Sequence, residues 1–437
     1  MQIMAHIKLQ GLIHPRQHGG RKGHSTNTCV LEVLGDSRKA KEDNNLVGIL
    51  QVDMSSAYDL INHELLLQKL RIMGLAPHTL AWVQNFLHLR SQCMEINGKM
   101  SATLTSGTQG VVQGGASSGE LFLIYLNDIP ECTPRPGQPK QRVTASQYVD
   151  DVTLVAWGKT PEELQATLQA SYQDMERTLT NHRMILDGGK TQLMILTKKQ
   201  EHKTITIQAG EQQIIHQDKL KILGINLSSS TKFDDHIREN KDSLVNAIYK
   251  KMSILRNVKP HVTMKTLASI GESLIGSTIL FGAPIWSQTT QKNMEAVQAA
   301  QTKAARMVSG QQSWGKQQTR THRQEIFTAL GWRNVKQLTT SANLNLLKTA
   351  LEKKTAESIN STFKISIPKN PRKAAVIRVD FVGKANRNCT YFEVQTSQQF
   401  NTLPDELRSP LLTAKMFKIL IRKHLATAHL LPLHNNS

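Results

Sequence analysis

Apolar and polar positions in the first half of the chain follow a pattern that predicts strands separated by helices. The stretch LVGILQVDM at 46–54 is mostly apolar, which predicts a short buried strand. Residues 59–74 then carry apolar side chains at helical spacing and end at Gly74, which is suited to closing a helix. The segments 142–148 and 152–157 are strand-like, and so few residues separate them that they predict a β-hairpin.

The strongest helix signal covers residues 160–179. Thr160 is a favourable N-cap and Pro161 suits the first helical position. One face of this segment carries Leu164, Leu168, Tyr172, Met175 and Leu179. Further upstream a glycine-rich turn leads into another helix, for which Ser117 and Glu120 are spaced as a capping box.

Strand signals fade after about residue 232, and a hairpin turning near Gly210 is the last clear one. Helical segments then dominate, at 236–256, 264–280, 294–310 and 413–431. The whole pattern predicts an α+β core of strands covered by helices, followed by a helical part and a basic terminus.

The net charge adds a class of partner to this picture. The chain has 437 residues, enough for two or three packed subdomains, and a formal net charge of +20. Residues 301–437 hold 22 Lys and Arg against 7 Asp and Glu, a net charge of +15. Such an excess favours a polyanion such as nucleic acid, while a solvated face or a flexible basic tail fits the charge alone equally well.

Cysteine usage and hydropathy exclude several other classes. The four cysteines, Cys29, Cys93, Cys132 and Cys389, lack the spacing of a zinc site, which indicates a reducing compartment. The first residues lack a signal-peptide pattern, and no apolar run approaches the length of a membrane span. We therefore expect a protein that acts inside the cell, in the nucleus or the cytoplasm, without a membrane partner.

Three carboxylates are the candidate chemistry. Asp53 ends the first predicted strand, and Asp150 and Asp151 lie at the turn of the predicted hairpin. If that strand pairs with the hairpin in an antiparallel sheet, all three reach one edge, where they repel one another unless a divalent cation such as Mg²⁺ is bound. Taken alone, Asp150 and Asp151 fit a solvated hairpin tip better.

The order of the motifs resembles one family. The segments VDMSSAYDLINHELLLQKL, GVVQGGASSGELFLIYLNDI, YVDD, MILDGGKTQLMIL and LKILGINL look like successive motifs of reverse transcriptases, specifically those of non-LTR (LINE-like) retrotransposons. The segment QHGGRKGHST at 17–26 resembles the motif that precedes them in that family. The resemblance implies a right-hand polymerase, with partial fingers and palm in 1–231, a helical thumb in 232–350 and a basic C-terminal region in 351–437.

The resemblance also implies an activity and its metal-binding residues. It implies an RNA-directed DNA polymerase that uses two Mg²⁺ ions to join dNTPs to a primer 3′-hydroxyl. The partners would be an RNA template and a DNA primer or an RNA–DNA duplex. Asp53, Asp150 and Asp151 match the family's catalytic carboxylates, and Lys190 falls where a lysine near the pyrophosphate can act as a general acid.

Five further residues match substrate-binding positions of the family. Tyr58 matches an aromatic residue under the incoming sugar, Gln113 and Gly114 match a segment beside template and nucleotide, and Arg21 and Lys22 match positions able to contact phosphate or template. Each also has an ordinary structural interpretation, such as a core tyrosine, a glycine loop or a solvated turn.

Departures from the family pattern leave alternatives open. Val112, Gly119, Gly20 and Asp187 replace the usual residues, and only about 50 residues precede Asp53. We therefore expect a chain truncated at its N-terminus, whose alternative function is that of a catalytically weak or inactive nucleic-acid-binding remnant. An RNA-templated RNA polymerase is a third possibility, against which Tyr58 argues. The sequence does not determine the oligomeric state.

Overall fold

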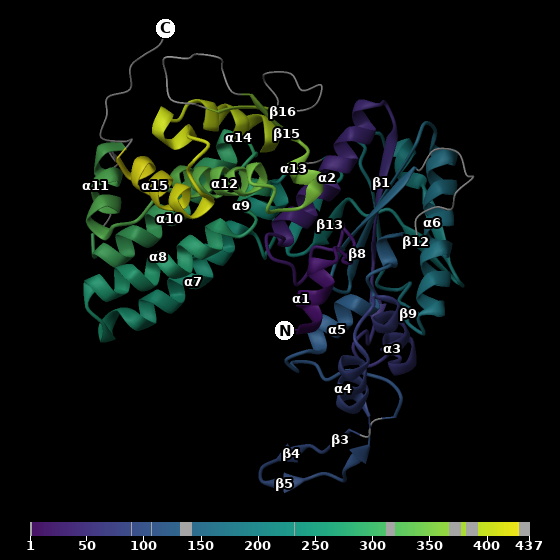
Figure 1. The fold of residues 1–437 in the computed structure, drawn as a ribbon. Helices are drawn as coiled ribbons and strands as arrows, with labels where there is room; N and C mark the ends of the chain where they lie inside the picture. The colour runs from purple at the N-terminus through teal and green to yellow at the C-terminus, as the bar shows by residue number, and fades with distance from the viewer. Residues whose placement is uncertain are drawn as a thin grey trace. The chain divides into compact units, whose positions relative to one another are not determined.

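The chain forms two compact units, Met1–Leu223 and Gly224–Ser437 (Figure 1). The computed structural model describes residues 2–88, 90–105, 107–131, 142–230, 232–311, 320–366, 377–381 and 392–427. Cys132, Cys389 and the last four residues of the predicted helix 413–431 lie outside them. Of the described cysteines, Cys29 and Cys93 are free thiols.

An antiparallel sheet with the strand order β10-β1-β8-β7 forms the centre of the first unit. The bounds of these strands are β1 Leu46–Val52, β7 Val143–Tyr148, β8 Asp151–Gly158 and β10 Gln192–Ile195. The predicted strand and hairpin are therefore confirmed, as is their antiparallel pairing. The edges of β1 pair with β10 and β8, and helices pack over its faces, so it is buried on both sides, which explains its nearly continuous apolar sequence.

Two helices cover the faces of this sheet, α2 (Thr26–Glu42) and α6 (Pro161–Asn181) (Figure 1). The predicted start of α6 is confirmed, since the Thr160 hydroxyl accepts a hydrogen bond from the Glu163 N–H. Gly48 permits close packing on this side, because a Cβ there would lie 2.9 Å from Leu168 Cδ1. The side chains of α6 and β1 thereby join one apolar core.

The remaining elements of the first unit are small. Its helices are α1 Gln2–Leu9, α3 His63–Ile72, α4 Pro77–Leu87, α5 Ser118–Tyr125, η1 Ile129–Glu131 and η2 Gln200–Thr204. Its short strands are β2 Met54–Ser55, β3 Ser91–Gln92, β4 Glu95–Ile96, β5 Lys99–Met100, β6 Leu104–Thr105, β9 Ile185–Leu186, β11 Thr206–Ala209, β12 Gln212–Ile215 and β13 Lys219–Ile222. The capping box predicted for Ser117 and Glu120 is wrong: Ser117 is the N-cap of α5 but makes no side-chain capping bond, since it has already turned into helical backbone geometry.

Long helices dominate the second unit. They are α7 Leu244–Val258, α8 Met264–Leu280, α10 Gln291–Ser309, α11 Arg320–Leu330, α12 Val335–Leu351, α14 Phe392–Asn401 and α15 Ala414–Thr427. Shorter elements are β14 Ile225–Ser228, η3 Asp235–Glu239, η4 Lys259–His261, α9 Ala283–Trp286, α13 Glu357–Asn360, β15 Phe363–Ser366, β16 Arg378–Phe381 and η5 Asp405–Arg408. The hairpin of β15 and β16 corrects the expectation that strands end near residue 232.

The core of the second unit lies between α7, α8, α10 and α12. Trp332 packs where Gly271 leaves room, because a Cβ on Gly271 would lie 2.4 Å from Trp332 Cζ2. Its indole N–H donates to the Ala268 carbonyl at 2.8 Å, so this large side chain is both buried and hydrogen-bonded. None of the helices in the described part of the chain combines the length and the apolar character needed to cross a membrane.

Candidate active site

The pairing of β1 with β8 brings two of the predicted carboxylates together. Val52 lies opposite Val152 in this antiparallel pair, so Asp53, one residue later, comes beside Asp151, one residue earlier. Each side chain is only partly exposed. Two acidic residues separated by almost a hundred positions therefore share one end of the sheet.

Asp150 lies in the tight turn between β7 and β8. Tyr148 pairs with Asp151 across this turn, and Val149 and Asp150 form its tip. Asp150 is exposed, whereas Asp151 is half-buried. Burial, together with the charges of Asp150 and Asp53, raises the pKa of Asp151 to about 6. The three carboxylates are therefore close enough to repel one another.

Lys190 is paired with two of the carboxylates at this end of the sheet. Its Nζ lies 3.5 Å from Asp53 Oδ2 and 3.2 Å from Asp187 Oδ2. The Asp187 N–H donates to the Asp53 carbonyl at 3.0 Å, and the Ser55 hydroxyl donates to Asp187 Oδ2 at 3.3 Å. The hydrogen bond with Asp187 and the charges of Asp187 and Asp53 raise the pKa of Lys190, which favours its ammonium form.

Tyr58 lies against the apolar core beside these groups. Its ring stacks on Phe122 with centroids 4.3 Å apart and an angle of 13° between the planes. Burial and the charge of Asp150 raise the pKa of its hydroxyl. The stack on Phe122 restricts the movement of the Tyr58 ring.

The other four predicted residues are not bonded to this cluster. Gln113 and Gly114 are exposed on the turn before α5, where Gly114 has a φ of +89° that favours glycine. Lys22 is exposed, while Arg21 donates through Nη1 to the carbonyls of its own loop. In the described part of the chain no hydrogen bond or ion pair joins any of these four residues to Asp53, Asp150 or Asp151.

Comparison with known proteins decides the family. The family model described as reverse transcriptase (RNA-dependent DNA polymerase) matches residues 1–227, more than half of the chain. The chain belongs to the reverse transcriptase family. The match covers β1, the β7–β8 hairpin and Lys190, so the site described above lies within the family domain.

Its curated relatives come from mobile elements. The probable RNA-directed DNA polymerase from transposon BS of Drosophila melanogaster is 22% identical over 302 residues, which cover 68% of this chain and 33% of that protein. The RNA-directed DNA polymerase from mobile element jockey of Drosophila funebris is 21% identical and covers 67% of this chain and 32% of that protein. This reverse transcriptase chain thus spans about a third of the length of these relatives.

Solved structures of telomerase also align with the reverse transcriptase chain. Apo telomerase from Candida tropicalis aligns with a TM-score of 0.40 and 12% identity, covering 80% of this chain and 57% of that one. Telomerase from Candida albicans, in complex with a fragment of telomeric RNA, aligns with a TM-score of 0.34 and 12% identity, covering 79% and 55%.

The donor atoms of the reverse transcriptase site suit a hard divalent cation. Three carboxylates supply hard oxygens, and the pKa of Asp151 is raised by burial and by the charges of Asp150 and Asp53, whose repulsion a bound cation would relieve. In the described residues, however, no three His, Cys, Asp or Glu side chains are already grouped closely enough to hold a metal ion. The residue types therefore fit a hard divalent cation.

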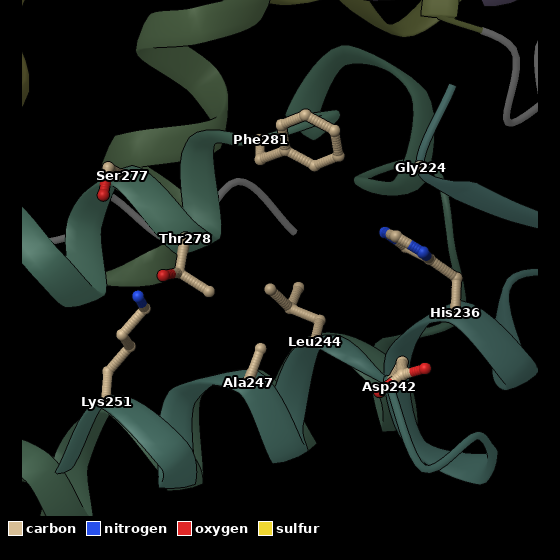
Figure 2. Close-up of a pocket in the computed structure, with 9 residues that line it drawn as sticks. All are labelled: Gly224, His236, Asp242, Leu244, Ala247, Lys251, Ser277, Thr278 and Phe281. Carbon is tan, nitrogen blue, oxygen red and sulfur yellow. The ribbon is translucent and has the colours of Figure 1, made fainter. Parts of the chain in front are cut away.

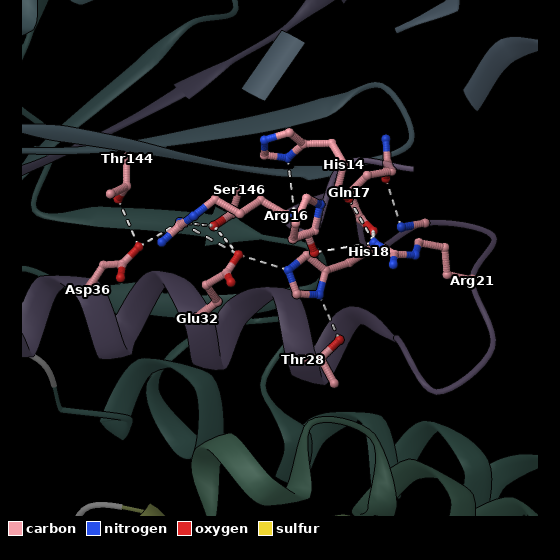
Figure 3. A network of polar contacts seen from close by, with 12 residues as sticks. His14, Arg16, Gln17, His18, Arg21, Thr28, Glu32, Asp36, Thr144 and Ser146 are labelled. Carbon is pink, nitrogen blue, oxygen red and sulfur yellow. Dashed lines mark hydrogen bonds and ion pairs between the residues drawn. The ribbon is translucent and has the colours of Figure 1, made fainter. Parts of the chain in front are cut away.

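A buried polar network links helix α2 to the β7 strand of the β7–β8 hairpin and includes residues that the sequence did not single out (Figure 3). The ring of His18 lies between Thr28 and Glu32 of α2, with Nδ1 2.9 Å from the Thr28 hydroxyl and Nε2 2.9 Å from Glu32 Oε2. The Ser146 hydroxyl of β7 donates to the same Glu32 oxygen at 2.8 Å. The only sequence signal for this network is His18, a histidine directly before two glycines. Its partner Glu32 is 14 residues away, so the pair could not be assigned from sequence spacing.

The second unit of the reverse transcriptase contains a pocket (Figure 2). The residues that line it come later in the sequence than the three carboxylates. It has a volume of about 360 Å³ and is lined by Gly224, His236, Asp242, Leu244, Ala247, Lys251, Ser277, Thr278 and Phe281. Phe281 caps the end of α8 and Lys251 comes from α7, so the pocket lies between these two helices.

Proposed function

We propose that this chain is an RNA-directed DNA polymerase that joins dNTPs to a primer 3′-hydroxyl on an RNA template. The observation that carries the proposal is the β1–β8 register, which brings Asp53 beside Asp151 and next to the Asp150 turn. Family membership supports the same reaction. We place it inside the cell, in the nucleus or the cytoplasm, where nucleic acids are available.

Asp53 and Asp150, with Asp151 beside them, would hold two Mg²⁺ ions. When bound, these ions lower the pKa of the attacking 3′-hydroxyl and neutralise charge on the α-phosphate and the leaving pyrophosphate. In the reaction the hydroxyl oxygen forms a bond to the α-phosphorus, the bond to pyrophosphate breaks, and the hydroxyl proton is released. The carboxylates of the chain orient the reacting atoms.

Lys190 supplies the positive charge at the edge of this cluster. Its ammonium group, already 3.5 Å from Asp53, would neutralise or protonate the leaving pyrophosphate. Tyr58 would exclude a 2′-hydroxyl, and Gln113 and Gly114 would lie against template and nucleotide. Lys22 would contact phosphate or template, and Arg21 would act in the same region.

The larger parts follow from the same proposal. Residues 1–231 would form partial fingers and palm, 232–350 a helical thumb, and 351–437 a basic region that binds the duplex backbone. The charge distribution supports binding of nucleic acid by the second half of the chain, since the unit Gly224–Ser437 holds 31 Lys and Arg against 13 Asp and Glu. Such contacts give affinity without sequence specificity.

Primer extension on an RNA template, with dNTPs or NTPs, tests the proposal. We expect extension with dNTPs and a loss of about a thousandfold, roughly 4 kcal/mol, in Asp150→Ala, because one metal ligand is removed. Asp174→Ala is the control, since Asp174 lies on α6 in a surface pair with Arg177. Duplex binding without extension by any of the three proteins would instead support a non-catalytic nucleic-acid-binding role.

A further inference from the structure

The backbone of Val149, between β7 and Asp150, has an unusual conformation. Its φ is +60°, in the left-handed region that a β-branched residue rarely adopts. Such strained conformations persist only where surrounding contacts hold them, and they cluster at functional sites. The direction in which Asp150 leaves the turn depends on this one residue.

A second segment, the loop 14–21, holds this turn from outside the hairpin. Gln17 Oε1 accepts hydrogen bonds from the Val149 N–H at 3.2 Å and from the Gly19 N–H at 2.8 Å. The Gln17 side chain is fully buried, so these bonds are shielded from water. The backbone on either side of Gln17 pairs with Gln147, through the bond from Gln147 N–H to the Arg16 carbonyl at 2.9 Å and that from His18 N–H to the Gln147 carbonyl at 2.8 Å.

Gly19 makes this close approach possible. A Cβ at this position would lie 2.5 Å from Val149 Cγ2 and 2.7 Å from the Val149 nitrogen. Atoms do not approach so closely, so any side chain at 19 would push the loop and the turn apart. The backbone of Gly19 therefore packs directly against the strained residue.

The loop is itself fixed at both ends (Figure 3). Arg21 Nη1 donates to the carbonyls of His14 at 2.7 Å and Gln17 at 3.0 Å, which closes the loop on itself. On its other side, the buried His18 ring is held by Thr28 and Glu32 of α2. Gln17 is thus held by contacts with helix α2 and Arg21 as well as by the backbone pairing with Gln147 of the hairpin.

We propose that Gln17 and Gly19 are positioning residues that hold Val149 in its strained conformation and thereby fix Asp150 for catalysis. The role assigned to Asp150 rests on the proposed polymerase function. Arg21 then acts by stabilising the loop, because its Nη1 already donates to backbone carbonyls.

Gln17→Met tests the hydrogen bonds, because methionine has a similar length but a thioether that accepts only weakly. We expect kcat for primer extension to fall about 100-fold, as for other misplacements near 1 Å, with KM for dNTP little changed. The Mg²⁺ concentration for half-maximal activity should rise, and Gln17→Glu, which keeps the accepting oxygen, should restore part of the rate. Gln165→Met, at an exposed position of α6, is the matched control.

Amide hydrogen exchange tests the positioning role of Gln17 and Gly19 separately from the proposed polymerase function. We expect the peptide that spans residues 147–152 to exchange faster in Gln17→Met than in the wild type or Gln165→Met, while the peptides of α6 exchange at the wild-type rate. If the wild type does not extend primers, the proposed polymerase function fails. The exchange rate of residues 147–152 still shows whether Gln17 holds the turn. Unchanged exchange and unchanged Mg²⁺ dependence in Gln17→Met would overturn the proposal.

Gly19→Ala tests the close approach, with Gly35→Ala as its control. Gly35 lies within α2, where an added Cβ meets nothing within 4 Å, so alanine is tolerated there. We expect Gly19→Ala to reproduce the loss of kcat and the faster exchange at 147–152. Equal activity of the two alanine variants would contradict the positioning role of Gly19.

Discussion

At the scale of single residues, Tyr58 offers the most direct test of which sugar the site accepts. Its ring is fixed by the stack on Phe122 and lies near Asp150, so it cannot move aside for a larger substrate without losing that packing. We expect Tyr58→Val to reduce discrimination against ribonucleotides by about 100-fold, roughly 3 kcal/mol, because the ring that would exclude a 2′-hydroxyl is removed. The ratio of kcat/KM for dNTP and NTP on the same RNA template measures it.

Tyr58→Phe is the matched control for this prediction. It keeps the ring and the stack on Phe122 but removes the hydroxyl. If the ring excludes the 2′-hydroxyl sterically, discrimination between dNTP and NTP should stay as in the wild type. Equal loss in Tyr58→Phe and Tyr58→Val would assign discrimination to the hydroxyl, and no loss in either would remove Tyr58 from the nucleotide site.

Asp151 makes a prediction about pH in the metal-free protein. Burial and the charges of Asp150 and Asp53 raise its pKa to about 6, so the folded chain binds this proton more tightly than the unfolded chain does. Its ionisation therefore destabilises the fold increasingly as pH rises from near 4 to about 6, and constantly above that. Below about pH 4 the group is protonated in both states and has no effect.

We expect Asp151→Asn to stabilise the protein at pH 7.5 in EDTA by roughly 1 kcal/mol, a value reduced because the side chain is partly exposed. The gain should disappear as pH falls towards 4, and Mg²⁺ should reduce it at pH 7.5. Thermal melting across this pH range measures the effect. A gain that is independent of pH would show that repulsion between carboxylates is not its cause.

At the scale of elements, Lys69 ties α3 to α5 and α6. Its Nζ lies 2.5 Å from the Tyr125 carbonyl, 2.6 Å from Asp128 Oδ1 and 2.6 Å from His182 Nε2. Burial by itself raises the pKa of Asp128, but the hydrogen bond with His182 and the charge of Lys69 outweigh it and lower that pKa. The ionised carboxylate is thus stabilised in the folded state.

Lys69→Met should lower the free energy of unfolding by about 1 kcal/mol at pH 7.5, since it removes the cation beside the Asp128 carboxylate, a value reduced because that side chain is partly exposed. Because Asp128 has a lowered pKa, this loss should be present above its ordinary pKa near 4 and shrink as pH falls below it. Urea denaturation measures it, with Arg71→Met, exposed on the same helix, as control. Equal effects of both substitutions would mean that the contacts of Lys69 with Tyr125, Asp128 and His182 contribute nothing to the free energy of unfolding.

How much of the fold could be predicted depends on the range of the interactions. The strand β1, the β7–β8 hairpin and helix α6 were predictable, because apolar periodicity and cap residues act over a few positions. The hairpin of β15 and β16 was missed, because its four-residue strands are short and partly exposed and carry little apolar pattern. The capping box at Ser117 failed because spacing alone does not fix backbone geometry.

In the candidate site, too, the contacts that could be predicted are those that follow from local sequence patterns. That Asp53 and Asp151 would meet followed from one strand, one hairpin and the geometry of an antiparallel pair. The contact of Gln17 with Val149 joins residues 132 positions apart, and nothing in either local sequence names the other. The same holds for Lys69 and His182, which are 113 positions apart.

At the scale of the whole molecule, the two units differ strongly in charge. Gly224–Ser437 holds 31 Lys and Arg against 13 Asp and Glu, a net charge of +18, while Met1–Leu223 holds 23 against 21, a net charge of +2. The proposed catalytic carboxylates are therefore in a nearly neutral unit, and the charge that suits a nucleic acid backbone belongs to the other. Affinity and chemistry should then respond to different substitutions.

The helix α15 provides the test. Its Lys415, Lys418 and Lys423 are exposed, while Phe417 and Ile421 on its other face are buried. We expect replacement of these three lysines by Gln to weaken binding to an RNA–DNA duplex and to reduce the slope of log K against log salt by about 1 to 3, since each phosphate contact contributes about 0.9. Fluorescence anisotropy at several KCl concentrations measures both quantities.

The matched control removes three charges from the first unit, by replacing Lys198, Lys199 and Lys221 with Gln. All three are exposed, so both triple variants have the same net charge. If the phosphate contacts belong to the second unit, only the α15 variant changes the slope, while kcat at saturating duplex stays the same in both, because neither alters the carboxylates. An equal change of slope in the two variants would mean that total charge, and not a surface of the second unit, determines the affinity.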